Sequence, residues 1–287
     1  MFPETFAAEW IERITKPGEI VLDPFCGRGT APFQALLMNR RAVACDVNPV
    51  AFCVTRAKTN APVFSKALAR LRVLEREFRP ADWNLEAKSA SEFYRLAFSQ
   101  MTLRQLLFLR TRLRWKTSDT DCMIAALVLG SLHGETEKSP SYLSNQMPRT
   151  ISTKPDYSVR FWKERGYRPP ERDAFQLMRK QLRFRYESDP PARTATVLMT
   201  DMRELPRIRL GLRKPIRCVI TSPPYFDVTS FEEDQWLRLW FLGCAPRPTY
   251  GRISKDDRHT STSKYWDLVS DMWRPSSGKP TRCTVRC

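Results

Sequence analysis

The residues best suited to chemistry stand near the start of the chain, in the glycine-rich segment 23–30, DPFCGRGT. It follows a brief apolar run and precedes an apolar segment that continues to Met38. Gly27 and Gly29 have no Cβ and can take positive φ, so the backbone of such a turn can approach a bound ligand closely. No Gly-Lys-Ser or Gly-Lys-Thr follows, which disfavours a nucleoside triphosphate. The segment predicts a strand, a turn that cradles a nucleotide-like cofactor, and a helix, with a purely structural turn as the alternative.

A carboxylate ends the second apolar run, where 41–46 (RAVACD) closes on Asp46. In α/β nucleotide-binding folds a carboxylate at this place accepts hydrogen bonds from both ribose hydroxyls. Asp46 therefore predicts a ligand with a free ribose, with capping of the helix that begins near Pro49 as the alternative. Asp201 ends a later apolar run, 194–201, where it is suited either to bond an adenine amino group or to cap the turn that follows.

A second candidate site is the segment 221–225, TSPPY, which follows another short apolar run. Pro223 and Pro224 have no N–H, so the segment presents carbonyls and the Ser222 hydroxyl beside an aromatic ring. The two N–H donors of an amino group on a flat base can bond to the Ser222 side chain and the Pro223 carbonyl while Tyr225 stacks on the ring. The alternative is a Pro-Pro strand terminator with a packed tyrosine.

The elements that must position these segments alternate strand and helix. An entry helix, two strand–helix units and two later strands are predicted at 2–14, 19–60, 194–201 and 215–222. Consecutive strand–helix units imply a parallel, doubly wound sheet. Over 62–191 the strand pattern gives way to arginine-rich helical periodicity, which predicts a large helical insertion with a polar loop at 139–156. Helices are expected again at 231–242 and 265–273.

The charge balance favours a polyanionic partner. Lysine and arginine total 48 against 31 acidic residues, a net charge of +17, although a basic protein that binds nothing acidic is the alternative. Residues 62–190 alone hold 24 basic and 15 acidic residues, a net charge of +9. Their basic side chains can supply salt-dependent affinity for phosphates. Their aromatic residues can fill the space of an extruded base or form helix core, and the ones considered are Trp115, Tyr142, Tyr157, Phe161 and Trp162.

The cysteine and hydropathy patterns predict a cytoplasmic protein. The eight cysteines form no Cys-x-x-Cys pair, and those with apolar neighbours are expected to be buried: Cys45, Cys53, Cys122 and Cys218. No signal-peptide pattern opens the chain, and the most apolar run, 122–132, is too short to cross a bilayer. We expect no metal site, because His133 and His259 are isolated and Cys283 with Cys287 lacks two further ligands.

Taken together, DPFCGRGT, the strand ending CDVNP, and TSPPY resemble the motifs of the S-adenosylmethionine-dependent amino-group DNA methyltransferases. The Ser-Pro-Pro form resembles the cytosine-N4 type more than the adenine-N6 type. The resemblance covers roughly 2–60 and 194–243. It implies a Rossmann-like class I methyltransferase fold, S-adenosylmethionine as cofactor, and nucleoid DNA as partner, with the target base flipped out for methylation. A cognate restriction endonuclease, as in restriction-modification, is a further expected partner.

The resemblance also implies the roles of individual residues. The opening 3–6 resembles the family segment that closes over the methionine end of the cofactor. The implied cofactor-binding residues are Thr5, Phe6, Asp23, Phe25, Cys26, Gly27, Gly29, Thr30, Asp46, Val47, Asp201 and Met202. The implied catalytic loop is Ser222, Pro223, Pro224 and Tyr225. The expected domains are a cofactor-binding first half, a helical target-recognition insertion, a second half with the catalytic loop, and an irregular tail, at 1–61, 62–191, 192–274 and 275–287.

The sequence departs from the family pattern at its end. The family fold has seven strands, yet the 62 residues after Tyr225 carry little strand pattern, so we expect the C-terminal strands to be missing, as in a truncated copy. The fourth strand would then be an uncovered edge. Adenine-N6 methylation, guanine-N2 methylation of RNA, and an inactive DNA-binding relic stay open as alternatives. Cytosine-C5 methylation needs a cysteine nucleophile, usually in a Pro-Cys pair, and the sequence has no such pair.

Overall fold

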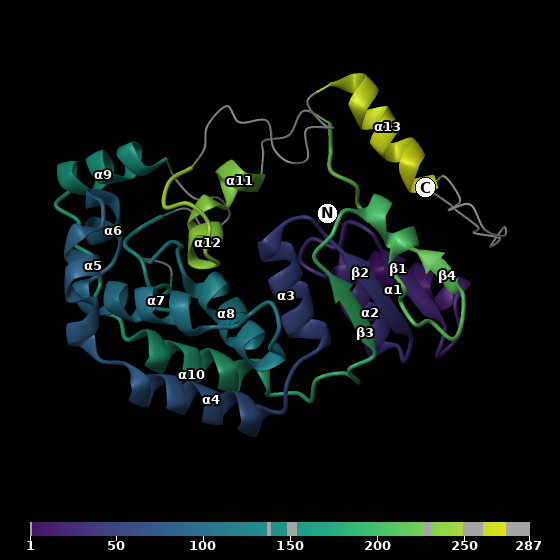
Figure 1. Cartoon of the computed structure of the whole chain (residues 1–287), viewed down its shortest axis with the longest axis horizontal. Coiled ribbons are helices and arrows are strands. Elements are labelled where there is room, and N and C mark those ends of the chain that lie inside the picture. Colours follow the sequence, from purple (N-terminus) through teal and green to yellow (C-terminus); the bar gives the residue numbers. More distant parts are fainter. Residues whose placement is uncertain (1, 137–138, 148–153, 227–230, 249–260, 274–287) are drawn as a thin grey trace. The chain divides into compact units, whose positions relative to one another are not determined.

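The computed structural model describes residues 2–136, 139–147, 154–226, 231–248 and 261–273. The chain divides into two compact units. We call residues 1–61, 190–230 and 253–287 the sheet unit, and residues 62–189 and 231–252 the helical unit. Figure 1 labels the elements of both units. The expected tail at 275–287, with Cys283 and Cys287, and His259 lie outside the described residues.

The sheet unit is built on four parallel strands in the order β3-β2-β1-β4. The strands are β1 (Ile20–Asp23), β2 (Arg41–Cys45), β3 (Ala195–Leu198) and β4 (Ile216–Val219). The chain builds outward from β1 through β2 to β3, and β4 then pairs with the other side of β1, where Ile20 lies between Arg41 and Ile216. The prediction of an α/β fold with a parallel sheet is confirmed.

Helices α1 and α2 cover one face of this sheet (Figure 1). The helices of the sheet unit are α1 (Glu4–Ile14), α2 (Thr30–Leu37), α3 (Pro49–Thr59), the 3-10 helix η2 (Met202–Arg207) and α13 (Thr262–Trp273). The shared core consists of small and aliphatic side chains: Ala7, Ile11, Val21, Ala31, Ala35, Leu36, Ala42, Cys218 and Ile220. Small residues at the contacts let helix backbones approach the strands closely, so this core is thin and well packed.

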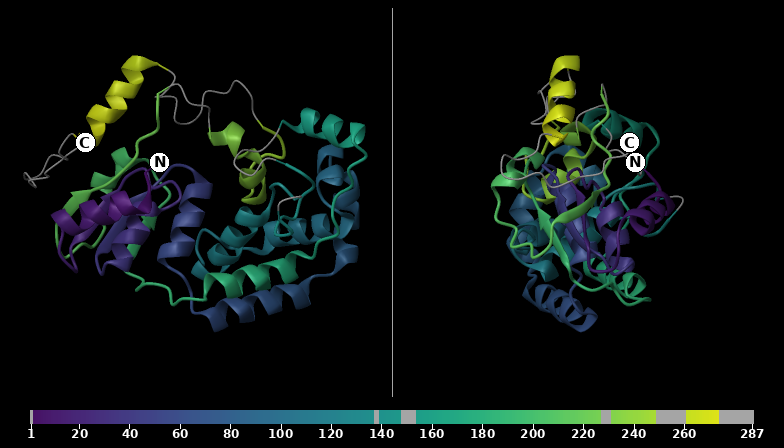
Figure 2. Two further views of the ribbon diagram at one scale, coloured as in Figure 1. Left: turned by 180° about the vertical axis from the view of Figure 1, so that it is seen from behind. Right: turned by 90° about the vertical axis from the view of Figure 1, so that its right-hand side faces the viewer.

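The helical unit contains the other described helices, which Figure 2 shows from two further sides. They are α4 (Phe64–Glu77), η1 (Pro80–Trp83), α5 (Asn84–Ser89), α6 (Glu92–Ala97), α7 (Gln100–Arg112), α8 (Asp119–Ser131), α9 (Pro155–Glu164), α10 (Ala174–Arg185), α11 (Phe231–Asp234) and α12 (Trp236–Phe241). Helix α8 is apolar on nearly all sides and packs against α4 and α10, which is typical of a central buried helix.

Three segments differ from the expectations. The helical pattern over 91–115 forms two helices, because Phe98 is extended and the side chain of Ser99 accepts a hydrogen bond from Thr102 N to begin α7. The expected helix at 231–242 is likewise divided, into α11 and α12. Helix α9 begins at Pro155, inside the stretch expected to be a loop, with its proline in the first turn.

Burial agrees with the predicted state of the cysteines. The side chains expected to be buried are indeed so: Cys45, Cys53, Cys122 and Cys218. Among the described residues, none of the helices is both long and apolar enough to cross a lipid bilayer.

Candidate functional site

The predicted site segments follow the carboxyl ends of the four strands. Asp23 is the last residue of β1, Asp46 follows β2, Asp201 stands shortly after β3, and Ser222 stands shortly after β4. Because the strands are parallel, these ends lie at one edge of the sheet (Figure 1). The strand order reverses between β1 and β4, and ligands in open α/β sheets bind outside the carboxyl ends at such a point.

The glycine turn after β1 is held by backbone hydrogen bonds. Cys26 N donates to Cys45 O at 3.1 Å, and Gly29 N donates to Cys26 O at 2.7 Å. Gly29 has φ +77°, and a Cβ there would lie 2.6 Å from Thr55 Oγ1 and 3.1 Å from Thr55 Cα. Gly27 has φ +49°, and a Cβ there would meet no atom within 4 Å. Gly29 therefore lets α3 pack on the turn, whereas Gly27 borders open space.

The carboxylate of Asp46 is anchored between this turn and helix α3. Its Oδ2 accepts a hydrogen bond from Gly27 N at 2.9 Å, and its Oδ1 accepts one from Asn48 N at 2.9 Å. Asn48 is the residue that caps α3, because its side chain accepts from Val50 N at 2.9 Å. These hydrogen bonds hold both carboxylate oxygens of Asp46 at the glycine turn, beside the open space at Gly27.

The buried side chain of Asp23 connects the glycine turn and the TSPPY segment through hydrogen bonds. Its side chain is 2% exposed, and its Oδ1 accepts hydrogen bonds from Thr221 Oγ1 at 2.7 Å and from Phe25 N at 3.2 Å. Burial raises the pKa of Asp23 to about 7, the two hydrogen bonds oppose this shift, and the nearby charge of Asp46 adds to it. Asp23 thus ties the glycine turn to the start of the TSPPY segment and is itself shielded from solvent.

The TSPPY segment presents a hydroxyl and an aromatic ring at the surface. Ser222, Pro223 and Pro224 are half-buried, and Tyr225 is 60% exposed. Ser222 Oγ donates to Tyr225 Oη at 3.4 Å, and this hydrogen bond lowers the pKa of the Tyr225 hydroxyl. The segment thus places an exposed aromatic ring beside the Ser222 hydroxyl.

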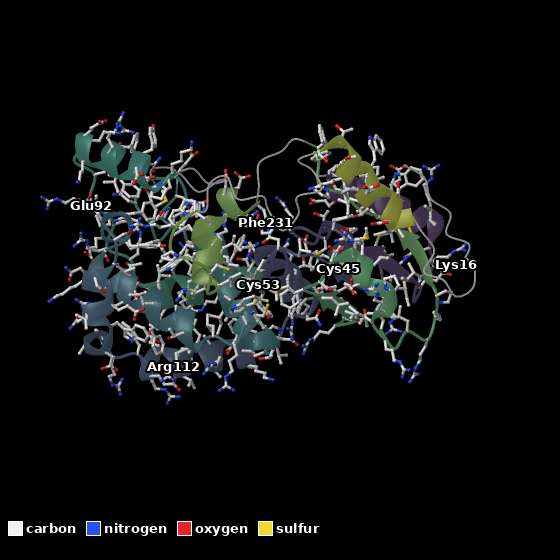
Figure 3. The ribbon with its side chains drawn as sticks, turned by 45° about the horizontal axis from the view of Figure 1, so that its top comes forward. Lys16, Cys45, Cys53, Glu92, Arg112 and Phe231 are labelled. Carbon is white, nitrogen blue, oxygen red and sulfur yellow. The ribbon has the colours of Figure 1, made fainter. Side chains whose placement is uncertain are left out.

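Asp201 serves as a helix cap in this structure. Its Oδ1 accepts from Arg203 N at 2.9 Å, and its Oδ2 pairs with the Arg203 guanidinium at 2.9 Å. The capping geometry considered as the alternative is therefore present, and an adenine contact from Asp201 stays a prediction. The next residue, Met202, belongs to a buried apolar cluster with Cys45 and Leu268. Figure 3 shows Cys45 at this end of β2.

The apolar cluster around Met202 combines residues from several elements. Partly buried side chains of Phe25, Leu198 and Leu205 pack against Cys45, Met202 and Leu268. Leu268 comes from α13, and Tyr265 of the same helix contacts Phe226, the residue after TSPPY, at a ring-centroid distance of 5.8 Å. Helix α13 therefore packs on η2 and on Cys45, the last residue of β2.

The remaining predicted residues are placed less centrally. Thr5 and Phe6 lie exposed on α1, where Phe6 contacts the ring of Trp10. The Cys26 thiol is buried, and burial raises its pKa well above the usual value, so it is neutral. Thr30 begins α2, and the half-buried Val47 stands between the Asp46 carboxylate and the α3 cap. No group of three or more residues suited to hold a metal is found in the described part of the chain.

Several residues of this edge were not predicted from the sequence. Thr55 Oγ1 donates to Gly27 O at 3.1 Å, and Lys58 Nζ donates to Arg28 O at 2.7 Å. Thr55 stands four positions after the buried Ala51 on one face of α3, so helical periodicity could have indicated it. Leu268 had no such local signal, because its partners are distant in sequence.

Comparison with known proteins supports part of this picture. Residues 1–55 match a family model of N6 and N4 methyltransferases that is described as DNA methylase. The matched segment runs from α1 through the glycine turn and Asp46 into α3, about a fifth of the chain. A search of curated proteins found no match to the chain. The first part of the sheet unit is thus similar to the amino-group DNA methyltransferases.

Proposed function

We propose that the protein is an S-adenosylmethionine-dependent DNA methyltransferase that acts on an exocyclic amino group, with cytosine N4 as the preferred target. The proposal assigns cofactor binding to the edge around Gly27 and Asp46, and amino-group recognition to Ser222 and Tyr225. It includes a cytoplasmic, nucleoid-associated location, target recognition by the helical unit, and a cognate restriction endonuclease as a companion of the enzyme.

One observation carries the proposal: a single buried carboxylate, Asp23, accepts hydrogen bonds from both motifs. Thr221 Oγ1 binds it at 2.7 Å from the TSPPY side, and Phe25 N binds it at 3.2 Å from the glycine turn. A donor site and an acceptor site for methyl transfer must be held in fixed register, because misplacement by about 1 Å can cost about 100-fold in rate. Asp23 supplies such a link at the point where the strand order reverses.

The residues present fit the cofactor. A Cβ at Gly27 would enter open space beside the Asp46 carboxylate, so the turn leaves a cradle for a ribose-bearing ligand. The buried Cys26 thiol leaves only the backbone of that residue for contact. When bound, S-adenosylmethionine supplies an electrophilic methyl group on a sulfonium. Ser222 and the Pro223 carbonyl are assigned to accept hydrogen bonds from the amino group, which directs its lone pair, while Tyr225 stacks on the base.

Methyl transfer can be tested directly with the full chain. The protein is incubated with labelled S-adenosylmethionine and mixed-sequence duplex DNA, and the digested nucleosides are separated and weighed by mass spectrometry. We expect N4-methylcytosine, and we expect Ser222→Ala to reduce its formation by about 100-fold or more. Ser65→Ala, at an exposed serine of α4 in the helical unit, is the matched control.

Each product answers a different question. N6-methyladenine would keep the site and change the target base, and N2-methylguanine formed only on RNA would contradict DNA as the substrate. Equal activity of Ser222→Ala and wild type would contradict the role of the TSPPY segment. Absence of any methylated nucleoside, with the protein folded and cofactor present, would favour an inactive DNA-binding protein.

A further inference from the structure

Helix α9 of the helical unit is anchored by one face. Trp162 is fully buried, its ring lies 5.6 Å from that of Phe93 in α6, and its Nε1 donates to Gln146 O at 2.8 Å. Lys163 Nζ pairs with the Glu92 carboxylate at 2.7 Å. Figure 3 shows Glu92 at the end of the helical unit where α9 packs on α6. These contacts fix the orientation of α9 within its unit.

The adjacent face of α9 carries one exposed aromatic ring and, beside it, two half-buried ones. Tyr157 is 54% exposed and stacks on Phe161, with ring centroids 6.1 Å apart and planes 28° apart. Phe161 in turn contacts Tyr167 at 5.8 Å, and the Arg165 guanidinium lies 4.0 Å from the centroid of the Phe161 ring. We call Tyr157, Phe161, Arg165 and Tyr167 the aromatic ridge. The exposed ring of Tyr157 offers a flat face on which a base can stack.

The charge around the ridge matches a polyanion. Residues 154–168 contain five basic and two acidic side chains. Arg160, Arg165 and Arg168 are exposed beside the ridge. Glu164 lies 3.8 Å from the Arg165 guanidinium, an exposed pair that contributes little and is easily exchanged for a phosphate. An apolar protein partner would leave these cations unpaired, whereas a nucleic acid supplies both flat rings and phosphates.

We propose that the aromatic ridge is a stacking surface for unpaired DNA bases, with the surrounding arginines binding the adjoining phosphates. The inference rests on the proposed function, because a methyltransferase that flips its target base leaves bases unstacked near its recognition unit. It assigns base contact to Tyr157 and Phe161 and excludes Trp162 and Trp115, which are buried.

The test separates stacking from charge. Affinity of the full chain is measured by fluorescence anisotropy for a labelled oligothymidylate of about 20 nucleotides and for an abasic strand of equal length. Wild type is expected to prefer the strand with bases. Tyr157→Ala should weaken oligothymidylate binding by about 5- to 100-fold and leave the abasic strand unaffected, whereas Tyr157→Phe keeps the ring and the affinity. Arg165→Gln should weaken both and lower the salt slope by about one.

The matched control is Phe184→Ala in α10, since Phe184 is 58% exposed and the Arg185 guanidinium lies 5.6 Å from its ring centroid. This variant should change neither affinity. The proposal would be contradicted if Phe184→Ala and Tyr157→Ala lost equal affinity for oligothymidylate, or if Tyr157→Ala lost none. It would also be contradicted if the wild type did not bind oligothymidylate at low salt. Titration of the same samples with S-adenosylmethionine reports on the sheet unit, so failure of the proposed function is recognised separately.

Discussion

Asp23 is a buried carboxylate that links the glycine turn to the TSPPY segment through hydrogen bonds. Its burial raises its pKa to about 7, although Thr221 and Phe25 N donate hydrogen bonds that favour the charged form. A shift from 3.8 to about 7 corresponds to about 4 kcal/mol between the two protonation states. Because the folded state prefers the protonated acid, this contribution to stability is fully present below about pH 4 and is lost as the pH rises through about 7.

Asp23→Asn is expected to remove this pH dependence. The amide oxygen can still accept from Thr221 and Phe25 N, and the amide cannot ionise, so the variant should gain stability over wild type by up to about 4 kcal/mol at pH 8 and little at pH 4. Urea unfolding at the two pH values measures this difference. If the difference in stability between Asp23→Asn and wild type were the same at pH 4 and pH 8, the pKa of Asp23 would not be raised in the folded protein.

The two glycines of the turn after β1, Gly27 and Gly29, should respond differently to substitution by alanine. Gly29→Ala must place a Cβ against Thr55, including its Cα, while Gly27→Ala meets only solvent. We expect Gly27→Ala to cost about 1–2 kcal/mol for its left-handed backbone and Gly29→Ala about 3 kcal/mol or more. Gly27→Ala should nevertheless abolish cofactor binding, because its methyl group occupies the cradle. Denaturant unfolding and calorimetry on both variants check this, and a destabilised Gly27→Ala that binds cofactor normally would contradict the cradle.

At the scale of elements, α13 is attached to the site by a small contact. Leu268 is buried with Cys45 and Met202, whereas Trp266 on the same helix is exposed. The helix thereby covers apolar surface at the carboxyl edge of the sheet, next to the TSPPY segment through Tyr265 and Phe226.

Leu268→Ala should therefore lower the free energy of unfolding by about 2–4 kcal/mol, the usual cost of truncating a buried leucine. Trp266→Ala, from the exposed side, should change it by less than about 1 kcal/mol. Thermal unfolding of both variants measures the contrast. Equal effects would mean that α13 does not dock through Leu268.

The elements near the site could be predicted because their signals are local. Strand β1, the glycine turn and the cap of α3 follow from adjacent residues, and Pro49 in the first turn marks the helix start. The division of the segment 91–115 at Ser99, and helix α9 inside a polar stretch, depend on caps and packing that periodicity does not record. The role of Asp23 and the contact of Leu268 join residues far apart in sequence, so no local pattern indicated them.

At the scale of the whole molecule, the residues of the two proposals lie in different units. The sheet unit carries the glycine turn, Asp46 and TSPPY at one edge, and the helical unit carries the aromatic ridge. The net charge of +17 suits a polyanionic substrate for both. Parallel strands with a reversed order at β4 explain how segments separated by about 200 residues reach one carboxylate.

The central claim is that the edge around Gly27 and Asp46 binds S-adenosylmethionine, and calorimetric titration of the full chain tests it most directly. Wild type should show saturable binding, Asp46→Ala should lose it while staying folded by circular dichroism, and Asp156→Ala, at an exposed carboxylate of α9, should bind as wild type does. Absence of binding by folded wild type, or undiminished binding by Asp46→Ala, would contradict the account.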